Sequence, residues 1–233
     1  MYKLFSTTKS PIKGRMPVRK IPKSYIGVTG VMGTNQSIGN AEFESLLERD
    51  YLILLEFDPN VKTFEVQPVK IPVPGVPNGY HPDVLVEFHP SNDGTQNPSE
   101  LTEVKLLSDF QENAEQYAPK FACAEKYAAE RNWVFVKKDE SQIRTPKLQN
   151  LKFLRGFRRI QPEESLKIHL CDSIEKKGPC TIAELIEICM PSDESKQQLL
   201  PVLWNLILNK QIIADLDLPL VSDSEIWSEH LFE

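Results

Sequence analysis

Two short stretches of sequence decide the fold and suggest its chemistry: HPDVLVEF at residues 81–88 and ELTEVKL at residues 100–106. Both are short and apolar with interspersed acids, a pattern that predicts β-strands. Because strand side chains alternate between two faces, Glu103 and Lys105 share one face, while Asp83 begins the preceding strand. If the two strands are neighbours, Asp83, Glu103 and Lys105 meet at one end of a sheet.

This trio is suited to metal chemistry. Two carboxylates on adjacent strands form a hard oxygen site for Mg²⁺ or Mn²⁺, and the main-chain carbonyl of Val104 could add a ligand. Lys105 could orient or deprotonate an attacking water, or stabilise charge on a phosphate. A surface Glu–Lys pair between strands is the alternative interpretation. The apolar neighbours favour the metal, because charges inside buried strands are costly without compensation.

The flanking sequence predicts an α/β layer with a mixed central sheet. Apolar residues recur at three and four over residues 41–57, which indicates an amphipathic helix. A β-like run follows at 61–73, with turns at 72–78 and 90–99, a second helix at 110–131 and a strand at 133–136. One glutamate of the first helix could reach the same metal, although ordinary helix-surface acids remain the alternative; the candidates are Glu44, Glu48 and Glu56.

A second unit begins near residue 161. Short helices are expected at 165–176, 181–189 and 196–209, followed by a hairpin of 212–216 and 225–227, which is the order of a winged-helix domain. Thr181 and Glu184 have the spacing of a capping box. We therefore expect a basic arm over residues 1–40, a catalytic domain over 41–160 and a winged-helix-like domain over 161–233.

The net charge of −6 is unevenly distributed. Residues 1–40 carry seven basic and no acidic groups, so they form either an arm that binds phosphate backbone or a solvated terminus. A second basic stretch follows at 144–159, whose aromatic and leucine residues are expected in the core. The candidate DNA contacts are Lys13, Arg15, Arg19, Lys20, Lys152, Arg155, Arg158 and Arg159.

Several classes of protein find no support in the sequence. The four cysteines form no CxxC pair, which argues against structural zinc. No apolar run is long enough for a membrane span and no signal peptide is recognisable, so we expect a cytoplasmic protein. Neither a phosphate-binding Gly-rich loop nor a Gly-x-Ser-x-Gly motif is present, which leaves ATPase and serine hydrolase interpretations without a basis.

The chain resembles the TnsA endonuclease subunit of heteromeric cut-and-paste transposases. The resemblance rests on SLLERDY at 45–51, LLEFDPNV at 54–61, FEVQP at 64–68, HPD at 81–83 and EVK at 103–105. It implies a restriction-endonuclease-like domain followed by a small winged-helix-like domain. It also implies that Glu48, Asp83 and Glu103 are metal-binding acids and that Lys105 is the catalytic lysine. Some relatives have Gln in place of Glu103, so the full Asp and Glu-x-Lys set here indicates an active nuclease.

The resemblance further implies Mg²⁺-dependent cleavage of double-stranded DNA at the 5′ ends of a transposon. The partners would be a DDE transposase subunit, TnsB, and an AAA+ regulator, TnsC. Residues 161–233 carry five basic and fourteen acidic groups, a charge that favours protein docking over DNA binding. Candidate docking anchors are Trp204, Trp227, Leu231 and Phe232. A stand-alone restriction or repair nuclease and a non-catalytic scaffold are the alternatives.

Overall fold

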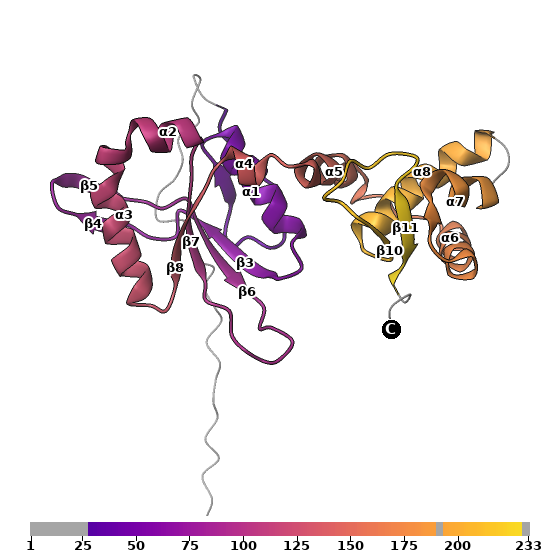
Figure 1. The fold of residues 1–233 in the computed structure, drawn as a ribbon, viewed down its shortest axis with the longest axis horizontal. Coiled ribbons are helices and arrows are strands. Elements are labelled where there is room, and N and C mark those ends of the chain that lie inside the picture. Colours follow the sequence, from indigo (N-terminus) through magenta and orange to yellow (C-terminus); the bar gives the residue numbers. More distant parts are fainter. Residues whose placement is uncertain (1–27, 190–192, 230–233) are drawn as a thin grey trace, which may run out of the picture. The chain divides into compact units, whose positions relative to one another are not determined.

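The computed structural model describes residues 28–189 and 193–229 (Figure 1). The chain divides into two compact units between Asp139 and Glu140. Among the predicted residues, Lys13, Arg15, Arg19, Lys20, Leu231 and Phe232 lie outside the described part of the chain.

A four-stranded mixed sheet forms the centre of the first unit. Its strands, in spatial order, are β3 (Val61–Val66), β6 (Val84–Phe88), β7 (Glu100–Val104) and β8 (Val134–Lys138). The first three are antiparallel, whereas β7 and β8 run parallel. The mixed sheet expected from the sequence is therefore confirmed. Val84 of β6 lies opposite Thr102 of β7, so the same register places Asp83 opposite Glu103.

Helices cover both faces of this sheet. α1 (Leu46–Phe57) packs on the face of Thr102, whose hydroxyl lies 3.3 Å from the Tyr51 hydroxyl. α3 (Ala114–Ala129) packs on the opposite face, where Ala124 and Leu101 share one buried cluster. The layers, with α3 and α1 on the two sides, can be followed in Figure 1. Apolar contact on both faces leaves the strand ends as the accessible part of the sheet.

The first helix starts later than the sequence pattern predicted. Residues 41–43 form β2 (Ala41–Phe43), which pairs with β1 (Gly30–Met32) inside the expected arm. Ser45 begins α1 as its N-cap, because its hydroxyl accepts the Glu48 N–H at 3.1 Å. Apolar β2 residues happen to continue the helical spacing of α1, which explains the wrong helix start.

Two further elements differ from expectation. The single run predicted at 61–73 is divided into β3 and β4 (Ile71–Val73), and the expected turn at 72–78 is the tip of a hairpin with β5 (Val76–Tyr80). The predicted helix at 110–131 is two helices, α2 (Leu107–Glu112) and α3, which meet at Asn113. Both breaks occur beside the end of the sheet that carries Asp83.

The second unit has the element order expected of a winged-helix-like domain. After α4 and α5, the three helices α6 (Glu164–Lys177), α7 (Ile182–Cys189) and α8 (Asp193–Leu208) lead into an antiparallel pair, in which Ile213 lies opposite Trp227, and a short third strand completes the sheet. The capping box is confirmed, since Thr181 and Glu184 exchange bonds of 2.8 and 3.1 Å. The elements are α4 (Glu140–Ile143), α5 (Pro146–Leu154), η1 (Arg155–Phe157), α6 (Glu164–Lys177), β9 (Cys180–Thr181), α7 (Ile182–Cys189), α8 (Asp193–Leu208), β10 (Ile212–Ala214) and β11 (Glu225–Ser228).

The boundary between the units lies about twenty residues before the expected position of 160/161. Residues 140–160 belong to the second unit because buried Asn150 of α5 is bonded to its last loop. The Asn150 amide donates to the carbonyls of Leu216 (2.9 Å) and Leu218 (2.7 Å) and accepts from the Leu220 N–H (3.1 Å). The basic stretch 144–159 is therefore part of the C-terminal unit, which carries 11 basic and 15 acidic groups.

Within the described ranges, no helix is both long and apolar enough to cross a membrane.

Candidate functional site

Asp83, Glu103 and Lys105 lie together at one end of the central sheet. The Lys105 ammonium is 3.3 Å from Asp83 Oδ2 and 3.1 Å from Glu103 Oε1. Asp83 is held by the main chain as well, because Val104 N–H donates to its Oδ2 at 2.7 Å. The strand register and these contacts produce the convergence that the alternating pattern predicted.

The Lys105 ammonium occupies a cage of oxygen atoms. It also donates to the Val104 carbonyl at 3.2 Å, so the three oxygens around it come from Asp83, Glu103 and Val104. These are the three groups that the sequence offered as metal ligands. The arrangement fits a divalent cation in its donor chemistry, since Mg²⁺ and Mn²⁺ prefer carboxylate and carbonyl oxygens.

The site carries more negative charge than Lys105 neutralises. Glu103 is 3% exposed and Asp83 8% exposed. Burial, followed by the charge of Asp83, raises the pKa of Glu103 to about 8. Burial and Asp83 likewise raise the pKa of Glu48 to about 7. Clustered buried carboxylates favour a bound cation, because only a positive charge or a proton relieves their repulsion.

Lys105 is held in its charged form. Burial alone would lower its pKa, but the charges of Asp83, Glu103 and Glu48 outweigh this and raise it above the ordinary value. A lysine that keeps its proton is a poor general base. The environment therefore favours an orienting and charge-stabilising role for Lys105 over deprotonation of water.

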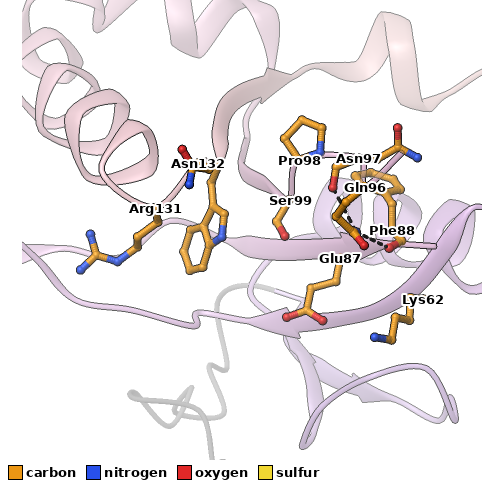
Figure 2. A pocket seen from close by; sticks show the side chains of 10 residues that line it. Lys62, Glu87, Phe88, Gln96, Asn97, Pro98, Ser99, Arg131 and Asn132 are labelled. Atoms are coloured by element: carbon orange, nitrogen blue, oxygen red, sulfur yellow. Dashed lines mark hydrogen bonds between the residues drawn. The ribbon is translucent and has the colours of Figure 1, made fainter. Parts of the chain in front are cut away.

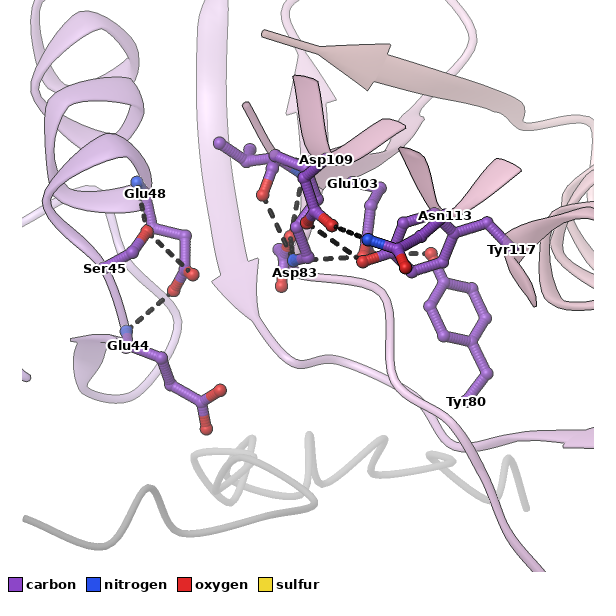
Figure 3. A network of polar contacts seen from close by, with 11 residues as sticks. Glu44, Ser45, Glu48, Tyr80, Asp83, Glu103, Asp109, Asn113 and Tyr117 are labelled. Atoms are coloured by element: carbon purple, nitrogen blue, oxygen red, sulfur yellow. Dashed lines mark hydrogen bonds and ion pairs between the residues drawn. The ribbon is translucent and has the colours of Figure 1, made fainter. Parts of the chain in front are cut away.

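Glu48 occupies a different position from the other acids. Its Oε2 accepts the Glu44 N–H at 2.7 Å and its Oε1 accepts the Ser45 hydroxyl at 3.0 Å, so it caps the start of α1. Figure 3 shows Glu48 on α1, facing the region of Asp83. No set of three His, Cys, Asp or Glu side chains within the described ranges is gathered closely enough to hold a metal. A site with three carboxylates would require Glu48 to leave its cap, and its role as a ligand stays a prediction.

Tyr80 is a member of the site that sequence reasoning missed. Its hydroxyl donates to Glu103 Oε2 at 2.7 Å, which leaves Oε1 directed to Lys105. Burial and the charge of Glu103 raise the pKa of Tyr80, so the hydroxyl stays protonated and remains a donor. The Tyr80 ring packs against Phe121 of α3, with centroids 6.2 Å apart. The only sequence signal that could have identified Tyr80 is its position as an aromatic residue three positions before Asp83.

A second polar network joins α2 to α3 next to this site (Figure 3). Asp109 accepts from the Asn113 amide at 2.6 Å and from the Tyr117 hydroxyl at 3.0 Å. Tyr117 in turn stacks on Phe121, with centroids 5.2 Å apart. This network fixes the break between the two helices, and its residues were not singled out from the sequence.

The basic stretch of the second unit is partly exposed. Lys152 and Arg159 are exposed, whereas Arg155 and Arg158 are half-buried. The expectation that its aromatic residues enter the core is wrong for Phe153, which is 49% exposed. Phe153 packs edge-on against Phe157 and Trp204, with centroids 5.2 and 5.3 Å away. The leucines of the same stretch are buried, as expected.

The mixed sheet, its paired carboxylates and the adjacent lysine define a protein of the restriction-endonuclease-like class. Two family models match the chain: TnsA-like endonuclease N terminal over residues 58–140 and TnsA endonuclease C terminal over residues 142–216. The chain belongs to the TnsA family and is an endonuclease subunit of a transposase. No curated protein matches it. The two matches meet next to the boundary between the structural units.

Proposed function

We propose that the chain is a Mg²⁺-dependent nuclease that hydrolyses DNA at the 5′ ends of a transposon during cut-and-paste transposition, with Mn²⁺ able to substitute. The observation that carries the proposal is the oxygen cage of Asp83, Glu103 and Val104 around a single cationic position. Membership of the TnsA family supports DNA as the substrate. The end specificity rests on the family resemblance.

In this proposal, different residues bind the metal, orient its ligands and stabilise charge on the phosphate. Asp83, Glu103 and the Val104 carbonyl would hold the metal, and Tyr80 would fix the orientation of Glu103. A bound Mg²⁺ would supply Lewis acidity and lower the pKa of a coordinated water. Lys105, displaced from the oxygen cage but still protonated, would stabilise negative charge on the phosphate.

The finer assignment of partners is part of the same proposal. TnsB would cut and join the 3′ ends, and TnsC would couple both nucleases to the target. We assign TnsC docking to the C-terminal unit because its last 73 residues are strongly acidic. Half-buried Trp204 and Trp227 are the described anchor candidates.

Calorimetric titration with Mn²⁺ tests the metal site in the full chain. Wild type should bind Mn²⁺, Asp83→Ala should not, and Asp93→Ala in an exposed loop should bind like wild type. Equal binding by wild type and a folded Asp83→Ala chain would refute the site. Cleavage of transposon-end DNA in the presence of TnsB then tests the reaction, and Asp83→Ala should form the complex without cutting.

A further inference from the structure

A polar pocket adjoins the carboxylates on the side of the β4–β5 hairpin. It has a volume of about 500 Å³ and is lined by Lys70, Asn78, Gly79, Tyr80, His81 and Lys120. We propose that this pocket binds one backbone phosphodiester of the DNA, next to the phosphodiester that is cut. This inference rests on the proposed function, because it supplies that site with a second contact to the same substrate.

The pocket and the catalytic acids share a wall. Tyr80 lines the pocket, while its hydroxyl donates to Glu103 Oε2 at 2.7 Å. His81, another lining residue, is separated from Asp83 only by Pro82. A DNA strand held at Asp83 and Glu103 therefore has its neighbouring phosphates close to this pocket, since backbone phosphates follow one another at each nucleotide.

The lining matches the chemistry of a phosphodiester. Two lysines, an amide and an imidazole supply hydrogen-bond donors, and none of the described lining residues is acidic. Neither Lys70 nor Lys120 forms an ion pair with a residue that the structure describes. Lys120 is half-buried and lies 5.4 Å from the ring centroid of Tyr117, so α3 supports its side chain. Two lysines without acidic partners beside a cluster of acids favour an anionic ligand.

Gly79 is required by the shape of the hairpin at this pocket. Its φ of +61° belongs to the left-handed region, and a Cβ there would lie 2.7 Å from the Ile71 carbonyl oxygen. The same Cβ would lie 3.2 Å from Lys70 Cε, so any side chain would displace this lysine. Glycine thus allows the two strands to approach and Lys70 to lie across the hairpin.

A second pocket in the same unit differs from the first because an acidic side chain lines it, and it supplies a control. It has a volume of about 610 Å³ and lies at the end of β6 opposite to Asp83, lined by residues that include Lys62, Glu87 and Arg131 (Figure 2). Glu87 places a carboxylate in its wall, and Arg131 is stacked on Tyr127 at 3.6 Å from the ring centroid. Its position, remote from Asp83 along β6, makes Lys62 a matched control for the lysines of the first pocket.

The test is binding of a short fluorescein-labelled DNA duplex to the full chain in EDTA, followed by anisotropy over a series of salt concentrations. Combining Lys70→Gln with Lys120→Gln should weaken binding and reduce the slope of log K against log salt by about 0.9, the loss of one phosphate contact. Lys62→Gln should leave affinity and slope unchanged. An effect of the double variant no larger than that of Lys62→Gln would overturn the proposal.

Three further measurements distinguish a contact with DNA from binding of free phosphate and from failure of the metal site. The first uses a series of duplexes, each with a neutral methylphosphonate at a different backbone linkage. When the neutral linkage is the one beside the cut, the two lysine substitutions should cause no further loss of DNA affinity, whereas at every other linkage they should still weaken binding. Saturation of the pocket by inorganic phosphate, with unchanged DNA binding in the double variant, would overturn the assignment to DNA. The double variant should still bind Mn²⁺ like wild type, so failure of the pocket and failure of the metal site give different results.

Discussion

The ammonium of Lys105, the residue that follows β7, and the carboxylate of Glu103 within β7 form an ion pair of 3.1 Å at the centre of the oxygen cage. The same ammonium contacts Asp83 Oδ2 and the Val104 carbonyl. A metal bound by these three oxygens would have to take the place of the ammonium. Lys105 is therefore expected to compete with the metal before it assists the reaction.

Replacing Lys105 by methionine tests this competition. Lys105→Met keeps most of the side-chain volume and removes the charge, so Mn²⁺ affinity should rise about tenfold, or ~1.4 kcal/mol. Cleavage of transposon-end DNA should be lost in the same variant. Calorimetry gives the first value and a strand-cleavage assay the second. Weaker Mn²⁺ binding by Lys105→Met would contradict the competition.

Tyr80→Phe should separate the orientation of Glu103 from the packing of the ring. The variant keeps the contact with Phe121 and loses the bond to Glu103, so Mn²⁺ affinity should fall several-fold. Stability should fall by about 1.5 to 3 kcal/mol, the range for hydrogen bonds to charged groups. The matched control is Tyr117→Phe, which loses the bond to Asp109. If both variants bind Mn²⁺ like wild type, Tyr80 does not position Glu103.

The metal-free chain should lose stability as the pH rises from about 4.5 to about 8. Glu48 and Glu103 have pKa values near 7 and 8 in the folded chain and about 4.5 when unfolded. Between these values the folded chain binds more protons than the unfolded chain, so the free energy of unfolding decreases with pH. Urea unfolding in EDTA at a series of pH values measures the decrease.

Two controls identify which groups cause the decrease of stability with pH. Glu103→Gln should flatten the decrease, because the amide does not titrate, and Mn²⁺ should oppose it by binding the ionised acids. The contribution of Lys105 lies at higher pH, since its pKa is raised above the ordinary value. A steeper decrease in Glu103→Gln would assign the effect to other groups.

Asn150→Ala should destabilise the C-terminal unit strongly. It leaves the carbonyls of Leu216 and Leu218 and the N–H of Leu220 without their partner, at a cost of about 3 kcal/mol in the free energy of unfolding. Gln149→Ala, exposed on the same helix, should change stability little. Urea unfolding of the full chain compares them. Similar losses in both variants would argue against residues 140–160 as part of this unit.

Neutralising the basic stretch tests its predicted contact with DNA. Arg155→Gln, Arg158→Gln and Arg159→Gln together should weaken duplex binding and flatten its salt dependence. Lys176→Gln with Lys177→Gln, exposed at the end of α6, is the control of similar charge. Circular dichroism confirms that the variants fold. An unchanged salt slope would leave these arginines a structural role alone.

The central sheet and the meeting of Asp83 with Glu103 were predictable, because alternation assigns side chains to faces and the polar loop 89–99 joins two β-like runs that are consecutive in the sequence. The start of α1 was not, since Phe43 of β2 continues the apolar spacing of Leu46 and Leu47. Only the cap at Ser45 separates the two elements. Local periodicity cannot distinguish them without the strand pairing.

The remaining differences come from contacts between distant parts of the sequence. Asn150 belongs to the second unit through residues 216–220, and Tyr80 reaches Glu103 because the hairpin lies beside β7. Neither contact leaves a periodic signal. The assignment of Glu48 as a metal ligand depended on family resemblance, and the structure shows the bonds that hold it at the helix start.

Main-chain hydrogen bonds at Val104 and Lys105 tie the cluster of charged side chains to the pairing of β7 with β8. The Val104 N–H binds Asp83 and the Val104 carbonyl binds Lys105, while the next N–H, of Lys105, donates to the Lys138 carbonyl of β8 at 3.2 Å. A slip of one residue in this pairing would turn Glu103 and Lys105 to the other face without any change of sequence. During synthesis, Asp83, Glu103 and Lys105 are all made before β8, so the hydrogen bond to Lys138 can form only after every residue of the cluster is already in the chain.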